Sequence, residues 1–362
     1  MITVTKTYLP PIKEYIKYVE EIWKSGFITN HSKYVLSLEK KLKKYLEVKH
    51  LFFVSNGTTA LQIAIRALDL KDGEIITTPF SYVASTSSIV WEHCRPIFVD
   101  IDPGTLTIDV KKIQKAITSK TKAILAVHVY GNSCDVEAIG KIAKKNKLKI
   151  IYDAAHAFGV KYKKIPLVNF GDISILSFHA TKIFHTVEGG AITTSDDQFA
   201  HKISYMRNFG HNGEESFFGL GINGKNTEFH AAMGLAILPK VKTFISRRRK
   251  LSKLYDEALK RAKLTRPGLF ENLEYNYSYY PVIFESESEL LRVKNSLNKH
   301  NIFPRRYFYP SLNTLNYVKK YSCPVSEDIA RRIMCLPLYE SLSKEEVNLI
   351  AKLIIASQKE VS

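Results

Sequence analysis

Short apolar runs alternate with longer segments of helical periodicity through the first two thirds of the chain. Each run has the length of a buried strand and is bounded by polar or turn residues. The runs predict strands at 51–54, 74–78, 96–99, 123–129, 149–153, 173–178 and 191–194. Apolar residues at helical spacing predict helices at 11–49, whose last part over 35–46 is amphipathic, and at 58–68, 84–91 and 136–145. This alternation indicates an α/β fold with a mostly parallel central sheet flanked by helices.

The pattern changes near Gly234. A long basic helix is predicted over 239–262, followed by alternating residues at 275–284 and by helices at 287–299 and 344–358. This second pattern is typical of an α+β unit. We therefore expect a large domain over residues 1–239 and a smaller C-terminal domain over 240–362, which fits the usual size of domains.

The chain is basic, with a net charge of +18 that comes from 53 Lys and Arg against 35 Asp and Glu. Such a surface attracts nucleic acid, anionic membranes or phosphorylated small molecules. The positive residues are spread along the chain, and the densest run, 247–250, falls in a predicted helix as a solvated face. Since no DNA- or RNA-reading module is visible, we expect no nucleic-acid partner.

The cysteines and the hydropathy of the chain indicate in which cellular compartment the protein works. The four cysteines, at 94, 134, 323 and 335, form no close pair, so we expect neither a metal site nor a disulfide framework. The first residues lack the apolar core of a signal peptide, and no apolar run approaches the roughly 20 residues of a membrane span. We therefore expect a cytoplasmic protein without a membrane partner.

Ligands of an open parallel sheet bind at the carboxyl ends of its strands. After the strand at 51–54, the residues Ser-Asn-Gly-Thr-Thr at 55–59 begin a helix. The free amides of a helix N-terminus, the small Gly57 and the hydroxyl of Thr58 suit a phosphate. The same residue types are also common as a plain helix cap, so this turn alone leaves both interpretations open.

Two other strand ends carry titratable residues. The strand at 149–153 ends in Asp153, three residues before His156, and a carboxylate buried there needs a partner such as a protonated cofactor nitrogen. A helix cap is the alternative for Asp153. The strand at 173–178 delivers Ser177 and then Lys182, which can form a Schiff base if burial lowers its pKa. An ordinary surface lysine is the alternative for Lys182.

Taken together, these three features describe one site. A phosphate turn, a carboxylate for a pyridinium and a Schiff-base lysine are the parts needed to hold pyridoxal 5'-phosphate (PLP). Their order and spacing along the chain suit the PLP-dependent transferases of fold type I.

Longer segments carry a resemblance to a known family. They read FVSNGTTAL, TTPFSYVAS, PIFVDIDP, VHVYGN, YDAAHAFG, ILSFHATK, EGGAITT, GINGKNTEFHAAMG and CLPLY. Over nearly its full length the chain resembles the DegT/StrS-like sugar-nucleotide aminotransferases. The segments SFHATK, EGGA, NFGH and GINGKN are most similar to members that act on dTDP-4-keto-6-deoxyglucose.

The resemblance implies roles for individual residues. Lys182 and Asp153 are the catalytic residues, on the cofactor's aldehyde carbon and ring nitrogen. The other cofactor contacts are Tyr82 stacked on the ring, His156 at the phenolic oxygen, and Gly57, Thr58 and Ser177 at the phosphate. Asn223 reaches the phosphate of the neighbouring subunit's cofactor, which implies a homodimer with shared active sites.

The resemblance also implies a cleft for a nucleotide sugar. We expect Arg305, Tyr307 and Tyr309 to contact its phosphates, base or sugar, and Asn30, His185 and Lys225 to belong to the same cleft. Many relatives carry Arg at the position of Lys225, and a lysine cannot make the bidentate contact of an arginine.

The implied activity is PLP-dependent transfer of an amino group from L-glutamate to dTDP-4-keto-6-deoxyglucose, giving dTDP-4-amino-4,6-dideoxyglucose. That activity belongs to deoxysugar biosynthesis, as for O-antigen and lipopolysaccharide. Three alternatives stay open: amination at C3 of the sugar, a PLP-dependent sugar dehydratase, and a non-catalytic regulator that binds nucleic acid. Lys182 favours transamination over dehydration, because dehydratase relatives replace this lysine with histidine.

Overall fold

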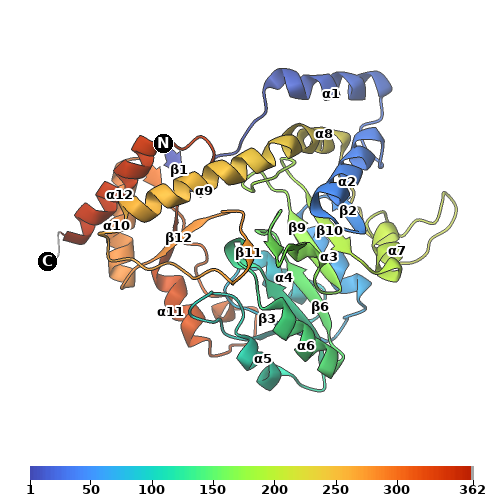
Figure 1. Cartoon of the computed structure of the whole chain (residues 1–362). Helices are drawn as coiled ribbons and strands as arrows, with labels where there is room; N and C mark the ends of the chain where they lie inside the picture. Colours follow the sequence, from blue (N-terminus) through green and yellow to red (C-terminus); the bar gives the residue numbers. More distant parts are fainter. Residues whose placement is uncertain (360–362) are drawn as a thin grey trace.

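The structure is a computed structural model, and it describes residues 1–359. A seven-stranded sheet forms its centre, in the order β2-β10-β9-β6-β5-β3-β4 (Figure 1). The strands are β2 (His50–Val54), β3 (Glu74–Thr77), β4 (Arg95–Phe98), β5 (Thr121–Val127), β6 (Lys149–Asp153), β9 (Ile173–Ser177) and β10 (Gly190–Thr194). Only β10 runs antiparallel to its neighbours. The predicted mostly parallel sheet is therefore confirmed, with strand ends shifted by one or two residues.

Helices cover both faces of this sheet (Figure 1). Along β5, Ile124 and Ala126 belong to one buried apolar cluster, whereas Leu125 and Val127 belong to another. Alternation places these side chains on opposite faces. One face carries α2 (Lys33–Leu46), α5 (Val110–Ala116), α6 (Val136–Asn146) and α8 (Glu228–Ile237), and the other carries α3 (Gly57–Ala67), α4 (Val83–Trp91) and α7 (Asp197–Met206).

The prediction of continuous helix over 11–49 is wrong at residues 26–32. Helix α1 (Ile12–Ser25) ends at Gly26, which has a φ of 69° and donates its amide to the Ile22 carbonyl at 3.0 Å. Glycine adopts this left-handed conformation without the steric cost that other residues meet, and it ends the helix. The next helix, α2, begins at Lys33, where the buried Glu228 carboxylate accepts the amides of Tyr34 and Val35 at 2.6 and 3.1 Å.

A third apolar cluster lies in the C-terminal part of the chain. Helix α9 (Val241–Ala258) leads from the sheet to this cluster (Figure 1). The cluster packs α9 against α10 (Glu287–Lys299), α12 (Lys344–Lys359), β12 (Tyr280–Ile283) and β14 (Ile333–Leu336). Of the predicted alternating segment 275–284, only β12 is a strand. Helix α11 (Pro324–Arg332) and β14 have no predicted counterpart. The division into 1–239 and 240–362 stays a prediction.

The remaining strands are short. Strand β1 (Ile2–Thr3) pairs in parallel with β13 (Ile302–Phe303), so the first residues of the chain lie against its C-terminal half. Strands β7 (Lys161–Tyr162), β8 (Ile165–Pro166) and β11 (Leu273–Glu274) form a small antiparallel sheet. Across residues 1–359, no helix combines the length and the apolar character that crossing a membrane requires.

Candidate active site

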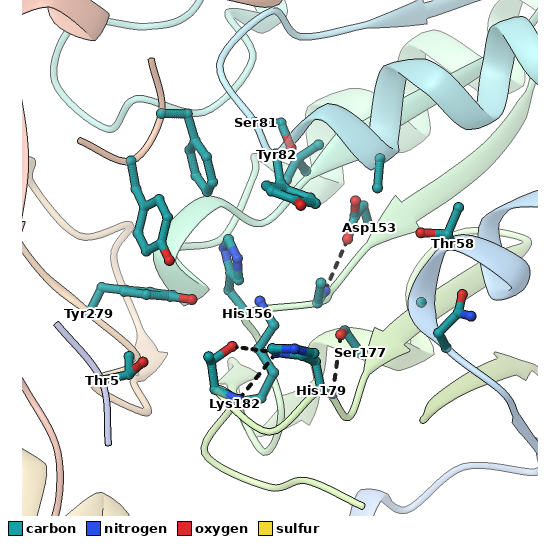
Figure 2. Close-up of a pocket in the computed structure, with 18 of the residues that line it drawn as sticks. Thr5, Thr58, Ser81, Tyr82, Asp153, His156, Ser177, His179, Lys182 and Tyr279 are labelled. Atoms are coloured by element: carbon teal, nitrogen blue, oxygen red, sulfur yellow. Dashed lines mark hydrogen bonds between the residues drawn. The ribbon is translucent and has the colours of Figure 1, made fainter. Parts of the chain in front are cut away.

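A cavity of about 600 Å³ lies at the carboxyl ends of β6 and β9. Its walls combine these strand ends with the first residues of the chain and with residues 303–308. The predicted site residues that line it are Gly57, Thr58, Tyr82, Asp153, His156, Ser177, Lys182, Arg305 and Tyr307. Figure 2 shows Thr58 and Ser177 on one side of this space and Tyr279 and Thr5 on the other. The strand-end rule therefore located the cavity correctly from the sequence.

The turn before α3 has the construction of an anion site. The side chain of Asn56 caps the helix by accepting the Thr59 amide at 2.8 Å. No acceptor within residues 1–359 takes the amides of Gly57 and Thr58, which precede the first intrahelical bond. A Cβ on Gly57 would lie 3.1 Å from the Ser177 Cβ, so a side chain there would crowd the cradle. The helix cap and the free amides thus coexist, on adjacent residues.

Asp153 ends β6 and is 5% exposed. Its carboxylate accepts the Ser85 hydroxyl at 2.7 Å and the Ala155 amide at 3.1 Å. No helix begins here, so the helix-cap interpretation is wrong. Burial raises the pKa of Asp153, and the two hydrogen bonds and the charge of Lys182 act against this rise. A carboxylate buried in this way is stabilised when a cationic group enters the cavity.

Lys182 faces the cavity from the turn that follows β9. Its backbone amide donates to the His179 carbonyl at 2.9 Å. Burial lowers the pKa of its amine to about 8, although the charges of Asp153 and Tyr82 act in the opposite direction. Lys182 is therefore not an ordinary surface lysine. A large fraction of its amine is neutral in mildly alkaline solution, as a nucleophile or proton acceptor requires.

The buried His156 ring is held in one orientation. Its Nδ1 accepts the Tyr130 backbone amide at 3.1 Å, so the neutral ring carries its proton on Nε2. Burial, reinforced by the charge of Lys182, holds the pKa of His156 well below its usual range. The ring stacks on Phe308 with centroids 5.7 Å apart and meets the Tyr279 ring at 5.0 Å. It can act in the cavity as a neutral hydrogen-bond donor.

The opposite wall is aromatic and basic. Tyr279, Tyr307 and Phe308 line it together with Arg305, which pairs with no carboxylate among the described residues. Sequence analysis missed Tyr279 and Phe308, and it also missed Thr3, Val4, Thr5, His179 and Glu188, which line the cavity too. The pairing of β1 with β13 brings the threonines there, and no local motif indicates such a long-range contact.

Two predicted substrate residues lie outside the cavity walls. His185 is buried, and its ring nitrogens engage the Tyr8 carbonyl at 2.8 Å and the Val187 amide at 3.2 Å. Both ring nitrogens are therefore occupied: Nε2 ties the N-terminal segment to the loop after Lys182, and Nδ1 holds the Val187 amide within that loop. Tyr309 is half exposed and lies under the Arg306 guanidinium, 3.7 Å from ring centroid to carbon.

Asn30, Asn223 and Lys225 also do not line this chain's cavity. Asn30 is exposed between α1 and α2, and the Lys225 amine lies 2.9 Å from the Asn223 side-chain oxygen. The Gly224 carbonyl accepts the Ser55 amide at 2.9 Å, which places this segment directly beside the turn at Gly57. Asn223 and Lys225 are thus near the cavity without entering it.

The described residues contain no cluster of three or more His, Cys, Asp or Glu side chains suited to a metal ion. All four cysteines are free and buried. The polar groups that converge on the cavity are instead an amine, a carboxylate, an imidazole and free backbone amides, which suit an organic phosphate with a cationic ring nitrogen.

Comparison with known proteins agrees with this geometry. The sequence profile of the DegT/DnrJ/EryC1/StrS aminotransferase family matches residues 11–354. The dTDP-4-amino-4,6-dideoxy-D-glucose transaminase of Shigella dysenteriae is 42% identical, over 98% of both chains. The enzyme of the same name from Escherichia coli is 38% identical, also over 98% of both chains. The solved structure of DesI in the presence of its TDP-sugar product is 27% identical, with a TM-score of 0.92 over 99% of this chain and 93% of that one.

The lowered pKa of Lys182 can be measured in the protein without cofactor. We expect its acylation rate, followed by mass spectrometry between about pH 6 and pH 11, to rise through a midpoint near pH 8 because only the neutral amine reacts. In Asp153→Asn the midpoint should fall further, because the carboxylate that stabilises the ammonium form is gone. A wild-type midpoint above about pH 10 would contradict this account.

Proposed function

Because this chain belongs to the DegT/DnrJ/EryC1/StrS aminotransferase family, we propose that it transfers the amino group of L-glutamate to dTDP-4-keto-6-deoxyglucose, forming dTDP-4-amino-4,6-dideoxyglucose. The family resemblance and the PLP fold type I that the motifs indicated are confirmed. The observation that carries the proposal is the convergence of Lys182, Asp153 and the turn at Gly57 on one cavity. The names of two relatives, each aligned over 98% of both chains, support the choice of sugar.

We propose PLP as the cofactor, because the residues present fit it. The free amides of Gly57 and Thr58, with the hydroxyls of Thr58 and Ser177, would hold its phosphate. Gly57 leaves the space that a Cβ would fill beside Ser177. The buried carboxylate of Asp153 would pair with the protonated ring nitrogen. When bound, the cofactor supplies an electron sink that stabilises negative charge on the carbon that loses a proton.

The chain's own residues supply proton transfer and orientation. The Lys182 amine, with its pKa near 8, accepts the proton from the donor's α-carbon and delivers one to C4 of the sugar in the second half-reaction. Asp153 keeps the positive charge on the ring nitrogen. The His156 Nε2 proton donates a hydrogen bond to the phenolic oxygen. The exposed Tyr82 ring, at the start of α4, would stack on the cofactor ring.

The aromatic and basic wall of the cavity, which includes Tyr279, Arg305 and Tyr307, would bind the sugar nucleotide. Arg305 is free of carboxylates in the described chain, and a guanidinium matches the geometry of phosphate oxygens. The Tyr307 and Tyr279 rings offer flat faces for a sugar or base. A net charge of +18 favours encounter with a doubly phosphorylated substrate. Tyr309, which does not line the cavity, would contact the sugar nucleotide only at the edge of this wall.

We further propose that the active unit is a homodimer. Helix α1 and the segment after α7 project from the body of the molecule (Figure 1). They expose large apolar side chains, among them Trp23 (76%), Phe27, Phe217 and Leu220 (71%). Isolated exposed apolar residues are ordinary, but a group of them marks an interaction surface. In this arrangement Asn223, with Lys225 and Asn30, would approach the cofactor or substrate of the other subunit.

The two half-reactions test the proposed activity. We expect visible absorption of the bound cofactor to disappear with L-glutamate and to return with dTDP-4-keto-6-deoxyglucose. In Asp153→Asn both steps should be about a hundredfold slower or worse, because the ring nitrogen loses its charged partner. The control Ser85→Ala removes one hydrogen bond to the same carboxylate and should cost less than about tenfold. A normal rate in Asp153→Asn would contradict the role of Asp153, and a sugar without effect would contradict the substrate.

Mixed dimers test the shared site. Lys182→Ala and Asn223→Glu homodimers should both be inactive, the second because a carboxylate repels the phosphate of the partner's cofactor. Their heterodimer, purified with two different tags, should regain activity, because one of its two sites then combines an intact Lys182 with an intact Asn223. If Asn223 served its own chain instead, every site would carry one defect and the heterodimer would stay inactive.

A further inference from the structure

Tyr130 has an unusual backbone conformation beside the active site. It lies in the short 3₁₀ turn Val129–Gly131 with a φ of 57° and a ψ of 9°. Residues with bulky side chains rarely adopt this left-handed conformation, and they hold it only where the surroundings determine it. The turn is pressed against the segment that follows β6, since a Cβ on Gly131 would lie 2.9 Å from the His156 carbonyl oxygen. Strained residues of this kind cluster at functional sites.

Three directional contacts hold Tyr130. Its amide donates to His156 Nδ1 at 3.1 Å, and its carbonyl accepts the Tyr275 hydroxyl at 2.9 Å. Its own hydroxyl donates to the backbone carbonyl of Tyr307. The Tyr130 ring is parallel to that of Phe308, with centroids 5.9 Å apart, and Phe308 in turn stacks on His156. One buried residue thus contacts both His156 and the aromatic wall.

The segment that forms this wall is otherwise anchored at its two ends and on its outer side. Arg305 exchanges backbone hydrogen bonds with Cys335 at 2.8 and 3.2 Å, and the Leu312 amide donates to the Pro79 carbonyl at 2.9 Å. On the outer side, the Arg306 guanidinium binds Glu287 and the Arg331 carbonyl. On the inner side, toward the sheet, the Tyr130 hydroxyl holds the Tyr307 carbonyl. Removing that hydroxyl would therefore free the Tyr307 carbonyl where the wall meets the cavity, while the packing of Phe308 on Phe80 and His156 is kept.

We propose that Tyr130 is a positioning residue for the sugar-nucleotide acceptor, through its hydrogen bond to Tyr307. The proposal rests on the function proposed above. Rings at Tyr279, Tyr307 and Phe308 beside an unpaired guanidinium match a molecule with a ring face and phosphates. An acyclic amino acid has no ring face to lay against them. Displacing the wall therefore affects the acceptor more than the donor.

The two contacts of Tyr130 can be separated by mutation. Tyr130→Phe removes the hydroxyl that holds Tyr307, but it keeps the ring beside Phe308 and the backbone amide that fixes His156. A matched control is Tyr255→Phe. The Tyr255 hydroxyl is likewise buried and donates to a backbone carbonyl, that of Pro337 at 3.0 Å, but it lies in the C-terminal apolar cluster.

Both half-reactions would be followed by stopped-flow absorbance in the enzyme with PLP bound. Unfolding in urea would measure the stability of each variant. In Tyr130→Phe we expect the sugar-nucleotide concentration for half-maximal rate to rise about three- to tenfold, as the loss of one buried hydrogen bond predicts. The glutamate half-reaction and the spectrum of the bound cofactor should be unchanged. Tyr255→Phe should lower stability and leave both half-reactions unchanged.

Two results would overturn the inference. One is a Tyr130→Phe enzyme that is less stable but uses the sugar nucleotide like wild type, which would make the hydroxyl purely structural. The other is an equal change in both half-reactions, which would mean that the wall serves donor and acceptor alike. A wild-type enzyme that reacts with glutamate but not with the sugar would instead refute the proposed substrate, so the two failures are distinguishable.

Discussion

The site depends on a carboxylate held out of water at the end of a parallel strand. Asp153 is 5% exposed, and within residues 1–359 it accepts two hydrogen bonds, from Ser85 and Ala155. Burial disfavours its charged form. A cation that enters the cavity beside the carboxylate therefore stabilises the folded protein. The same burial lowers the pKa of Lys182 to about 8 and keeps His156 neutral. One enclosed environment therefore sets the protonation of three groups: Asp153 as the partner of a cation, Lys182 as the base and His156 as the hydrogen-bond donor.

The two sides of the cavity come from different parts of the fold. The strand ends and the turn before α3 supply the groups suited to a phosphate and a ring nitrogen, and the sheet makes this side rigid. The other side consists of short strands and loops, β1, β13 and residues 304–311, pinned by contacts such as those of Tyr130 and His185. Variation in such loops changes specificity while the framework stays fixed.

The strands of the central sheet could be predicted from the sequence because each is a continuous apolar run, buried on both faces. Four candidate site residues could be proposed from these runs, because Asp153 and Ser177 stand at the ends of two of them and Gly57 and Lys182 follow within a few residues. The break at Gly26 and the residues Thr3, Thr5, Tyr279 and Phe308 escaped prediction. The helix at 11–49 has apolar spacing on both sides of the break, and the wall residues reach the cavity through pairings between distant segments. Asn30, Asn223 and Lys225 lie outside this chain's cavity. For Asn223 the resemblance implies a contact with the neighbouring subunit's cofactor, whereas Asn30 and Lys225 were expected in the substrate cleft.

The proposed reaction moves nitrogen from an amino acid to the C4 carbon of a nucleotide-linked keto sugar. Its most direct test is nuclear magnetic resonance of the product formed from ¹⁵N-labelled L-glutamate and dTDP-4-keto-6-deoxyglucose. We expect the label in an amine bonded to C4 of the sugar, with one equivalent of 2-oxoglutarate. Label at C3, or ammonia released with an unaminated sugar, would contradict the proposed reaction.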